Sequence, residues 1–144
     1  MLLVDEPIVG NSNAPLRLEG GWFLLRRSES QHAERHFVNW YLRHARAWIS
    51  NRIELYANRV DVQPQGIDVR RLGFRWGSCT PSGRVNFHWR TILLPPEIID
   101  YIIVHELAHL REPTHSALYW RRVERVIPDY LIRKKWLSEN GGKL

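Results

Sequence analysis

The spacing of apolar and polar residues indicates a long helix in the first half of the chain. Apolar side chains recur there at intervals of three and four residues: Phe37, Tyr41, Ala45, Trp48, Ile49, Ile53, Tyr56 and Val60. This period places them on one face of a helix. Ser28 followed by Gln31 is typical of a capping box, and Pro64 and Gly66 favour an end before them. We therefore predict a helix over residues 28–62.

Residues 1–27, in front of this helix, are predicted to form an arm and a short hairpin. Leu16-Arg17-Leu18 and Trp22-Phe23-Leu24-Leu25 flank Glu19-Gly20-Gly21. Two short apolar runs separated by glycines are typical of a strand pair with a glycine turn. The first fifteen residues are weakly patterned, so we expect them to form the arm.

Between residues 67 and 94 the period changes from helical to alternating. Two alternating sets of apolar residues occur: Leu72, Phe74 and Trp76, then Val85, Phe87 and Trp89. Between them, Thr80-Pro81-Ser82-Gly83 has proline and glycine at the positions that a type I turn favours. The pattern predicts an antiparallel β-hairpin over residues 67–94.

The last third of the chain is predicted to be helical. Pro95-Pro96 ends the second strand and begins a helix over residues 96–110, because proline is tolerated in the first helical turn. This helix must end before Pro113, and further apolar positions at helical spacing predict trailing helices over residues 116–139. No long linker divides the chain, so we expect one α+β domain over residues 1–144.

Composition narrows the class of protein. A length of 144 residues suits one domain with a hydrophobic core, and ordinary apolar and charged contents argue against disorder. The single cysteine, Cys79, excludes an internal disulfide and a thiolate-rich zinc site. There is no basic leader and no apolar run of about 18 residues. We expect a cytoplasmic protein without a membrane partner; the sequence does not indicate an oligomeric state.

The formal charge of +6 raises the question of a nucleic-acid partner. Arginines and lysines are scattered along the second half of the chain with tryptophans between them. Such scatter is more typical of a solvated face, and no recognised nucleic-acid motif accompanies it. Nucleic acid therefore stays a weakly supported alternative partner.

The chemistry of the chain is concentrated in His105-Glu106-Leu107-Ala108-His109. Two histidines four residues apart on a helix are separated by about 40° around the axis and roughly 6 Å along it, so both can bind one metal ion. Glu106 lies beside them, where it is better placed to contact a water on the metal than the metal itself. The alternative is a core helix with two satisfied histidines, but apolar runs rarely bury three ionisable groups without a partner.

A tetrahedral ion needs a third protein ligand and keeps its fourth position for water. His115, which follows the turn at Pro113, is the nearest candidate on the sequence. Glu112 and Glu124 are carboxylate rivals of a kind that such sites also use. Ligands of these types favour Zn²⁺ as the cofactor.

Residues outside the metal helix are candidates for contacts with substrate. Trp76, Gly77 and Ser78 lie on the first predicted strand, and Gly77 would allow another backbone to approach closely. Candidate donors to a developing oxyanion include backbone groups of this strand and the side chains of His88, Asn86 and Tyr119. Tyr119 also fits a packing role. Cys79 fits a plain strand position, and a reversible metal ligand is its alternative.

An ordered set of motifs runs through the second half of the chain. They are Arg75-Trp76-Gly77-Ser78-Cys79, Asn86, Leu94-Pro95-Pro96, Tyr101, His105-Glu106-Leu107-Ala108-His109, His115, Tyr119-Trp120, Pro128-Asp129-Tyr130 and Lys135-Trp136-Leu137. Over about residues 67–137 the chain resembles the YgjP-like metallopeptidase family, and it is more distantly similar to the WLM and SprT-like metallopeptidases.

The resemblance implies a minimal zincin-like metallopeptidase that cleaves a peptide or protein substrate. It implies zinc bound by His105, His109 and His115, with Glu106 as the general base. Members of the family usually carry a longer β-rich region before the long helix than this chain does.

The resemblance also leaves two alternative activities. YgjP-like proteins have been linked to nucleotide pyrophosphate hydrolysis, for which we would expect carboxylates for Mg²⁺ or a glycine-rich phosphate loop, and the sequence shows neither. The SprT-like similarity suggests a protease that acts on DNA-bound proteins.

Overall fold

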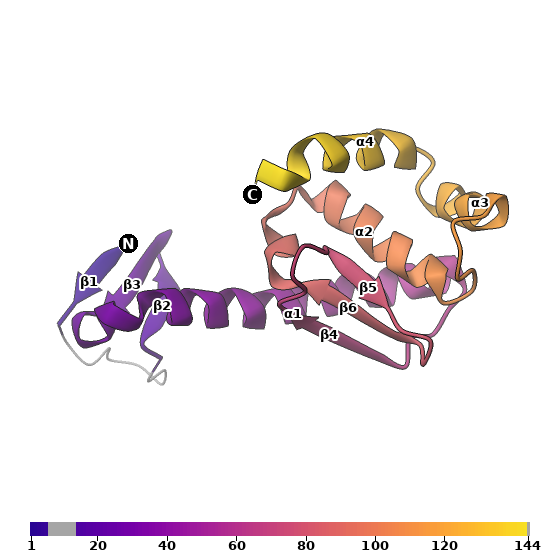
Figure 1. Cartoon of the computed structure of the whole chain (residues 1–144). Helices are drawn as coiled ribbons and strands as arrows, with labels where there is room; N and C mark the ends of the chain where they lie inside the picture. The colour runs from indigo at the N-terminus through magenta and orange to yellow at the C-terminus, as the bar shows by residue number, and fades with distance from the viewer. Residues whose placement is uncertain (6–13, 144) are drawn as a thin grey trace. The chain divides into compact units, whose positions relative to one another are not determined.

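The computed structural model describes residues 1–5 and 14–143, and the chain forms two compact units, Met1–Arg43 and His44–Leu144 (Figure 1). The long helix α1, Ala33–Val60, contributes to both units. Helices and two small sheets make up the described chain, which confirms the α+β class.

The first unit contains a three-stranded sheet of order β1-β3-β2, formed by Leu2–Val4, Trp22–Arg26 and Leu16–Glu19. β2 and β3 form the predicted hairpin. Gly20 and Gly21 join them with φ angles of 55° and 81°, the left-handed values that a two-residue hairpin turn requires. β1, which pairs in parallel with β3, was not predicted. The rest of the expected arm, residues 6–13, lies outside the described residues.

An aromatic cluster holds the start of α1 to this sheet. The ring of Phe23 meets Phe37 and Trp40 edge-on, each at a centroid distance of 4.9 Å. The predicted helix start at Ser28 is wrong, because Arg27–His32 form a tight 3-10 turn without a side-chain cap and α1 begins at Ala33. The 3-10 turn takes the chain directly from β3 into the helix.

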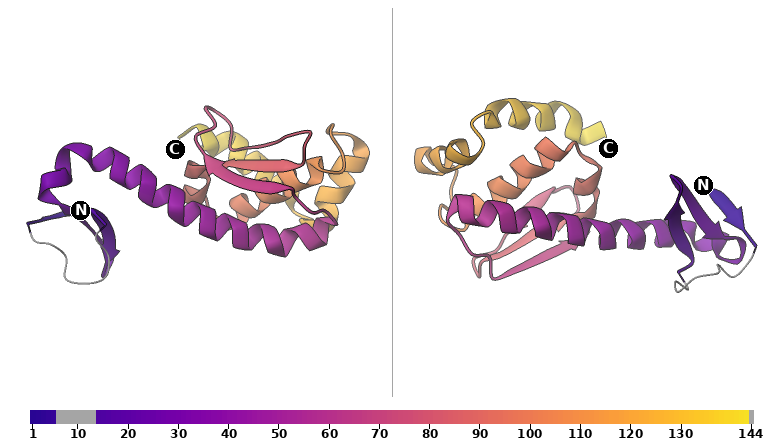
Figure 2. Two further views of the ribbon diagram at one scale, coloured as in Figure 1. Left: turned by 90° about the horizontal axis from the view of Figure 1, so that it is seen from below. Right: turned by 180° about the vertical axis from the view of Figure 1, so that it is seen from behind.

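In the second unit, the predicted apolar face of α1 is buried. Its buried residues here are Ala45, Ile49, Ile53, Tyr56, Ala57 and Val60. Figure 2 shows this half of α1 along one face of the second sheet, where Arg46 donates to the carbonyl of Val69 at 3.2 Å. Arg52 and the hydroxyl of Tyr56 both donate to the carboxylate of Asp100, so this buried acid is fully partnered.

The second sheet has the order β4-β6-β5, formed by Gly66–Arg70, Arg84–His88 and Gly77–Cys79. β5 and β6 are antiparallel as predicted, whereas the parallel partner β4 was not predicted. The predicted strand through Leu72, Phe74 and Trp76 is wrong: these residues form the loop before β5, in which Gly73 turns the chain with a φ of 60°. Trp89 begins the 3-10 helix Trp89–Leu93 instead of extending β6.

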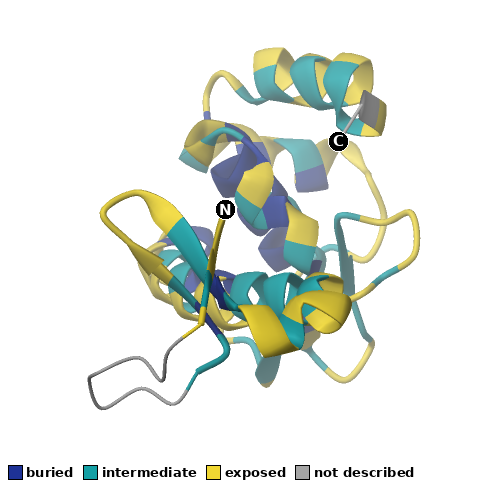
Figure 3. Cartoon of the chain, turned by 90° about the vertical axis from the view of Figure 1, so that its left-hand side faces the viewer, coloured by how far each residue is buried: buried dark blue, intermediate teal, exposed yellow. Residues whose placement is uncertain are grey.

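Three helices complete the second unit: α2 (Pro96–His109), α3 (Ala117–Val126) and α4 (Tyr130–Asn140), followed by the 3-10 turn Gly141–Lys143. α2 begins at Pro96 as predicted and packs against β5, α3 and α4. Most of its residues are buried, whereas α4 has none that are, a contrast visible in Figure 3. Within the described residues, no helix is long and apolar enough to cross a membrane.

Candidate metal centre

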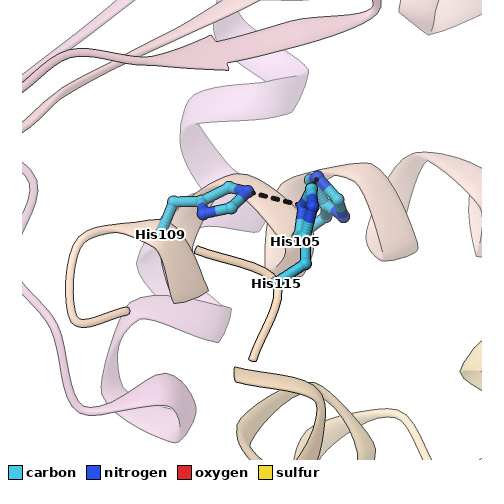
Figure 4. A group of neighbouring side chains, drawn as sticks. All are labelled: His105, His109 and His115. Carbon is cyan, nitrogen blue, oxygen red and sulfur yellow. Dashed lines mark hydrogen bonds between the residues drawn. The ribbon is translucent and has the colours of Figure 1, made fainter. Parts of the chain in front are cut away.

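Three imidazoles converge at the C-terminal end of α2. His105 and His109 project from the same face of the helix, and His115 approaches from the loop that follows it (Figure 4). The Nε2 atom of His115 lies 2.9 Å from that of His109 and 3.4 Å from that of His105. All three potential ligand atoms lie within 4.8 Å of one another. The structure thus brings together the three histidines that the resemblance named.

The turn after α2 returns the chain to the helix end. The N–H groups of Leu110, Arg111 and Glu112 donate to carbonyls of the last helical turn, so the helix closes tightly before Pro113. The hydroxyl of Ser116 then accepts from the Tyr119 N–H at 3.2 Å and caps α3. His115 is fixed between these two backbone structures, beside His109.

Contacts behind the rings fix their orientation. The Nδ1 atom of His109 donates to the carbonyl of Glu112 at 3.1 Å, which leaves the Nε2 lone pair free to bind a cation. The buried hydroxyl of Tyr119 donates to the carbonyl of His105 at 2.9 Å, and its ring stacks on His109 at 4.6 Å. Trp120 stacks on His115 at 5.5 Å. These contacts hold His109 and His115 in place, whereas the buried Nδ1 atom of His105 has no hydrogen-bond partner among the described residues.

The distances between the rings fit a single zinc ion. Bonds of about 2.0–2.1 Å in a tetrahedral geometry separate two ligand nitrogens by about 3.3 Å, close to the 2.9 and 3.4 Å observed here. Three uncharged imidazoles that point their Nε2 atoms at one spot repel one another unless a proton or a cation lies between them. The donor set thus fits a zinc-type cation.

The surroundings of His105 and His115 favour the uncharged imidazole, which is the form that binds metal. Burial, together with the smaller effects of the nearby His109, His115 and Lys134, lowers the pKa of His105 to about 3. Partial burial also lowers the pKa of His115, with contributions from His109 and Lys134. Few protons therefore compete with a metal ion at these rings near neutral pH.

Glu106 lies on α2 between the two histidines and is buried against β5. Burial raises the pKa of its carboxyl to about 7, although the positive charge of Arg75 opposes the shift. A Cβ atom at Gly77 would lie 2.8 Å from the Cγ of Glu106 and 3.0 Å from its Oε1. Because Gly77 has no Cβ atom, the side chain of Glu106 can lie close to the backbone of β5. A close approach at Gly77 was predicted, but from another backbone and not from Glu106.

The centre opens into a cleft of about 640 Å³ lined by Glu106 and His109 on one side and by β5 on the other. Within the described residues, β5 is an edge strand, because β6 alone pairs with it there. The carbonyl of Trp76 accepts from the N–H of His88 on β6 at 2.8 Å. Since peptide groups alternate along a strand, those of Gly77 and Cys79 point away from β6, toward the free edge.

The rival ligands lie in other contacts. The carboxylate of Glu112 accepts from Arg122 at 3.2 Å, and only its backbone carbonyl meets His109. Glu124 is exposed on α3 and does not belong to the histidine cluster. Cys79 lines the cleft, where burial and the charge of Glu106 raise the pKa of its thiol, and its Sγ lies 3.6 Å from the carbonyl of Thr80.

The structure separates the other predicted contact residues. Gly77 and Ser78 line the metal cleft, whereas Trp76 lines a neighbouring cavity. Asn86 is buried on β6 and its amide donates to the Ser78 hydroxyl at 3.2 Å. Tyr119 is fully buried, and its hydroxyl donates to the backbone carbonyl of His105. It therefore packs behind the metal site and does not face the cleft.

Sequence reasoning missed an aromatic and cationic layer above His115. The rings of Trp120 and Tyr130 stack with a centroid distance of 5.2 Å and an angle of 15° between their planes. The Nζ atom of Lys134 lies 4.3 Å from the centroid of the Trp120 ring. Trp120 and Tyr130 belong to the motifs that carry the family resemblance, which was the available signal for them. Lys134 was only one of the basic residues scattered along the second half of the chain.

Comparison with solved structures agrees with this geometry. The chain is similar to the crystal structure of the metallopeptidase zymogen of Pyrococcus abyssi abylysin, with a TM-score of 0.58 and 27% sequence identity. The match covers 67% of this chain and 94% of that chain. No curated protein matches the chain. Its fold and its histidine cluster thus define a protein of the metallopeptidase class.

The family is shown by a direct match. The family model for the YgjP-like metallopeptidase domain matches residues 10–140. The chain therefore belongs to the YgjP-like metallopeptidase family, as its motifs predicted. Membership implies a metal ion and a peptide or protein substrate.

Proposed function

We propose that this protein is a zinc-dependent peptidase in which His105, His109 and His115 bind the ion and Glu106 is the general base. The observation that carries the proposal is the convergence of three Nε2 atoms beside one buried carboxyl group. Zinc bound there would supply Lewis acidity, lowering the pKa of a water toward about 7 and polarising a substrate carbonyl.

The role of Glu106 follows from its environment. Burial raises the pKa of Glu106 to about 7, which is close to the pKa expected for a water on zinc. Two groups with similar pKa values can exchange a proton in both directions near neutral pH. Glu106 takes the proton from the attacking water and later gives it to the leaving amine. Gly77 keeps the carboxyl group close to the strand wall of the cleft.

The substrate is positioned by β5. An extended peptide pairs with the outward peptide groups of Gly77 and Cys79, which adds a strand to the sheet across the mouth of the cleft. The hydroxyl of Ser78 accepts from Asn86 and so keeps its own proton for donation into the cleft. Ser78 is therefore our candidate for a donor to the developing oxyanion.

Metal content and peptide cleavage, measured together, test this proposal. We expect the wild type to hold one zinc ion, to lose cleavage of a mixed peptide library on chelation, and to regain it when zinc is added. Glu106→Gln should bind zinc normally and cleave at least about 100-fold more slowly, the usual contribution of a general base. A variant that binds zinc and cleaves as fast as the wild type would refute the assigned base.

The alternatives are tested with other substrates. Among the described residues, the histidines form the single group of three side chains suited to a metal, and no cluster of carboxylates for Mg²⁺ accompanies them. Turnover of nucleoside triphosphates with zinc or magnesium, in a protein that cleaves no peptide, would favour the pyrophosphate hydrolase. Binding to DNA that falls steeply with salt would favour a DNA-associated protease.

A further inference from the structure

A second cavity adjoins the metal cleft. It has a volume of about 440 Å³ and lies between the loop that precedes β5, the end of β6 and the C-terminal turn after α4. Arg75 lines both this cavity and the metal cleft, so the two are neighbours along the same wall. The size is within the range of about 300–1,000 Å³ that is typical of ligand pockets. We call it the Arg75–Arg90 pocket.

The side chains that line this pocket carry positive charge and no negative charge. Arg75 and Arg90 line it, and no aspartate or glutamate does. In the described part of the chain, no carboxylate lies within salt-bridge distance of either guanidinium. The positive charge of Arg90 also acts on His88 in the pocket wall: burial lowers the pKa of His88, and the charges of Arg90 and of Arg71, outside the pocket, lower it further. An anionic ligand would relieve this repulsion.

The pocket also presents apolar surface. Phe74 is fully exposed, at 107% relative accessibility, on the loop that Gly73 turns outward. Trp76 and Leu137 line the pocket next to it. An apolar side chain held in solvent beside two guanidiniums that make no salt bridge among the described residues is typical of a binding surface. The ligand that fits such a surface has an anionic group on an apolar stem.

The position of the pocket relative to β5 suggests what that ligand is. Arg75 precedes the first residue of β5 by two positions. A peptide that pairs with the free edge of β5 therefore passes Arg75 as it leaves the metal cleft. Its next side chain, or its terminus, reaches the pocket without a change of direction.

We propose that the Arg75–Arg90 pocket is a substrate subsite that binds a carboxylate of the peptide, carried by an acidic side chain or by the C-terminus. Guanidinium groups bind carboxylates through two parallel hydrogen bonds, which gives both affinity and orientation. The inference rests on the proposed peptidase function. It adds a preference for substrates with an acidic group a short distance from the bond that is cleaved.

The test measures binding without turnover. Zinc-loaded Glu106→Gln is titrated with fluorescent peptides of one alanine-based sequence that carry a single glutamate, moved one position at a time, or glutamine at the same place. Each peptide is made with a free and with an amidated C-terminus. We expect one acidic position, or the free terminus, to tighten binding at least about tenfold, as charge-assisted hydrogen bonds do. The two sets of peptides distinguish the two sources of the carboxylate.

Second-site variants locate the effect. In the Glu106→Gln background, Arg75→Met and Arg90→Met should each abolish most of the preference, so that acidic and neutral peptides bind with nearly equal affinity. Arg125→Met, which removes one charge from an exposed position of α3, is the matched control and should retain the preference. Unchanged melting temperatures show that the variants are folded.

Several results would overturn the proposal. Equal affinity for acidic and neutral peptides would be one such result. Another would be a loss of the acidic preference in the Arg125→Met control as large as in the two pocket variants, which would indicate general charge attraction. A nucleoside triphosphate that binds more tightly than any peptide, and loses affinity in Arg75→Met and Arg90→Met, would assign the pocket to nucleotides. A wild-type protein that cleaves no peptide while the acidic preference persists would contradict the proposed function and leave the subsite standing.

Discussion

The two walls of the cleft are built in opposite ways. The helical wall, formed by the end of α2 and its turn into α3, carries three imidazoles and a buried carboxyl group, with His109 held by a backbone hydrogen bond and by stacking on Tyr119. The strand wall, formed by β5 and the loop before it, carries a free backbone edge and exposed guanidiniums. The first wall suits a cation, and the second suits an extended, anionic substrate.

This difference shows how the fold divides its tasks. The ligands of the helical wall come from eleven consecutive residues, 105–115, and their geometry is fixed by local hydrogen bonds and by the core. The strand wall depends on pairing between distant segments and has fewer buried contacts. We therefore expect changes in the helical wall to affect metal binding and chemistry, and changes in the strand wall to affect substrate.

The largest expected effect is the loss of a metal ligand from the helical wall. His109→Ala should weaken zinc binding by well over about 100-fold, because changes in the groups behind a ligand alone weaken it by about 10–100-fold. Competition with a chelating dye measures the affinity. His32→Ala, at an exposed histidine of the first unit, is the control and should bind zinc like the wild type. Equal affinity in the two variants would contradict the assignment of His109.

The second prediction concerns the stability of the metal-free protein. Glu106 has a folded pKa of about 7 against an ordinary value of 4.5, so the folded state favours the neutral acid and stability falls as pH rises between these values. Metal-free Glu106→Gln should therefore be more stable than the wild type by up to about 3 kcal/mol at pH 8. Denaturant titrations should show this difference vanish below about pH 4.5. A pH-independent difference would mean that burial does not shift this group.

The contact between the two walls gives the third prediction. Gly77→Ala places a methyl group against Glu106, and because misplacement by about 1 Å reduces rates by about 100-fold, we expect kcat to fall by that amount. Zinc content should not change. Gly66→Ala is the control, since its methyl group meets only the end of the Arg84 side chain, which can move away. Loss of zinc in Gly77→Ala would indicate a wider distortion of the site.

The smallest effect is expected at Lys134, whose charge acts on the helical wall from a distance. It lowers the pKa values of His105 and His115, and by the same repulsion it opposes a bound cation. Lys134→Met should tighten zinc binding by about two- to fivefold, as expected of an exposed charge. Salt should screen the difference, so it should shrink near 1 M ionic strength. Weaker zinc binding in this variant would show that the packing of Lys134 on Trp120 matters more than its charge.

The sequence predicted those features that depend on residues close together in the chain. The spacing of His105 and His109 and the prolines at each end of α2 were sufficient to place the metal helix. Pairing between distant segments was missed, as at β1 and β4, because a local pattern does not identify a strand's partner. The alternation of Leu72, Phe74 and Trp76 was misleading, since the left-handed Gly73 interrupts any strand there.

The candidate site shows the same limit. His115 could be named through the family resemblance, but its position depends on the turn through Pro113 and on the Ser116 cap. Gly77 was expected to face another backbone, and its contact with Glu106, which lies 29 positions further along the chain, required the packing of β5 on α2. Stacking of Trp120 on His115 likewise depends on the fold.

The central claim is that one metal ion is bound by three histidines, and its most direct test is a crystal structure of the zinc-loaded protein with anomalous scattering measured on both sides of the zinc absorption edge. We predict a single strong peak, at about 2.0–2.1 Å from the Nε2 atoms of His105, His109 and His115. A peak bound by the carboxylate of Glu112 or Glu124 in place of His115, or a peak elsewhere in the chain, would contradict the claim.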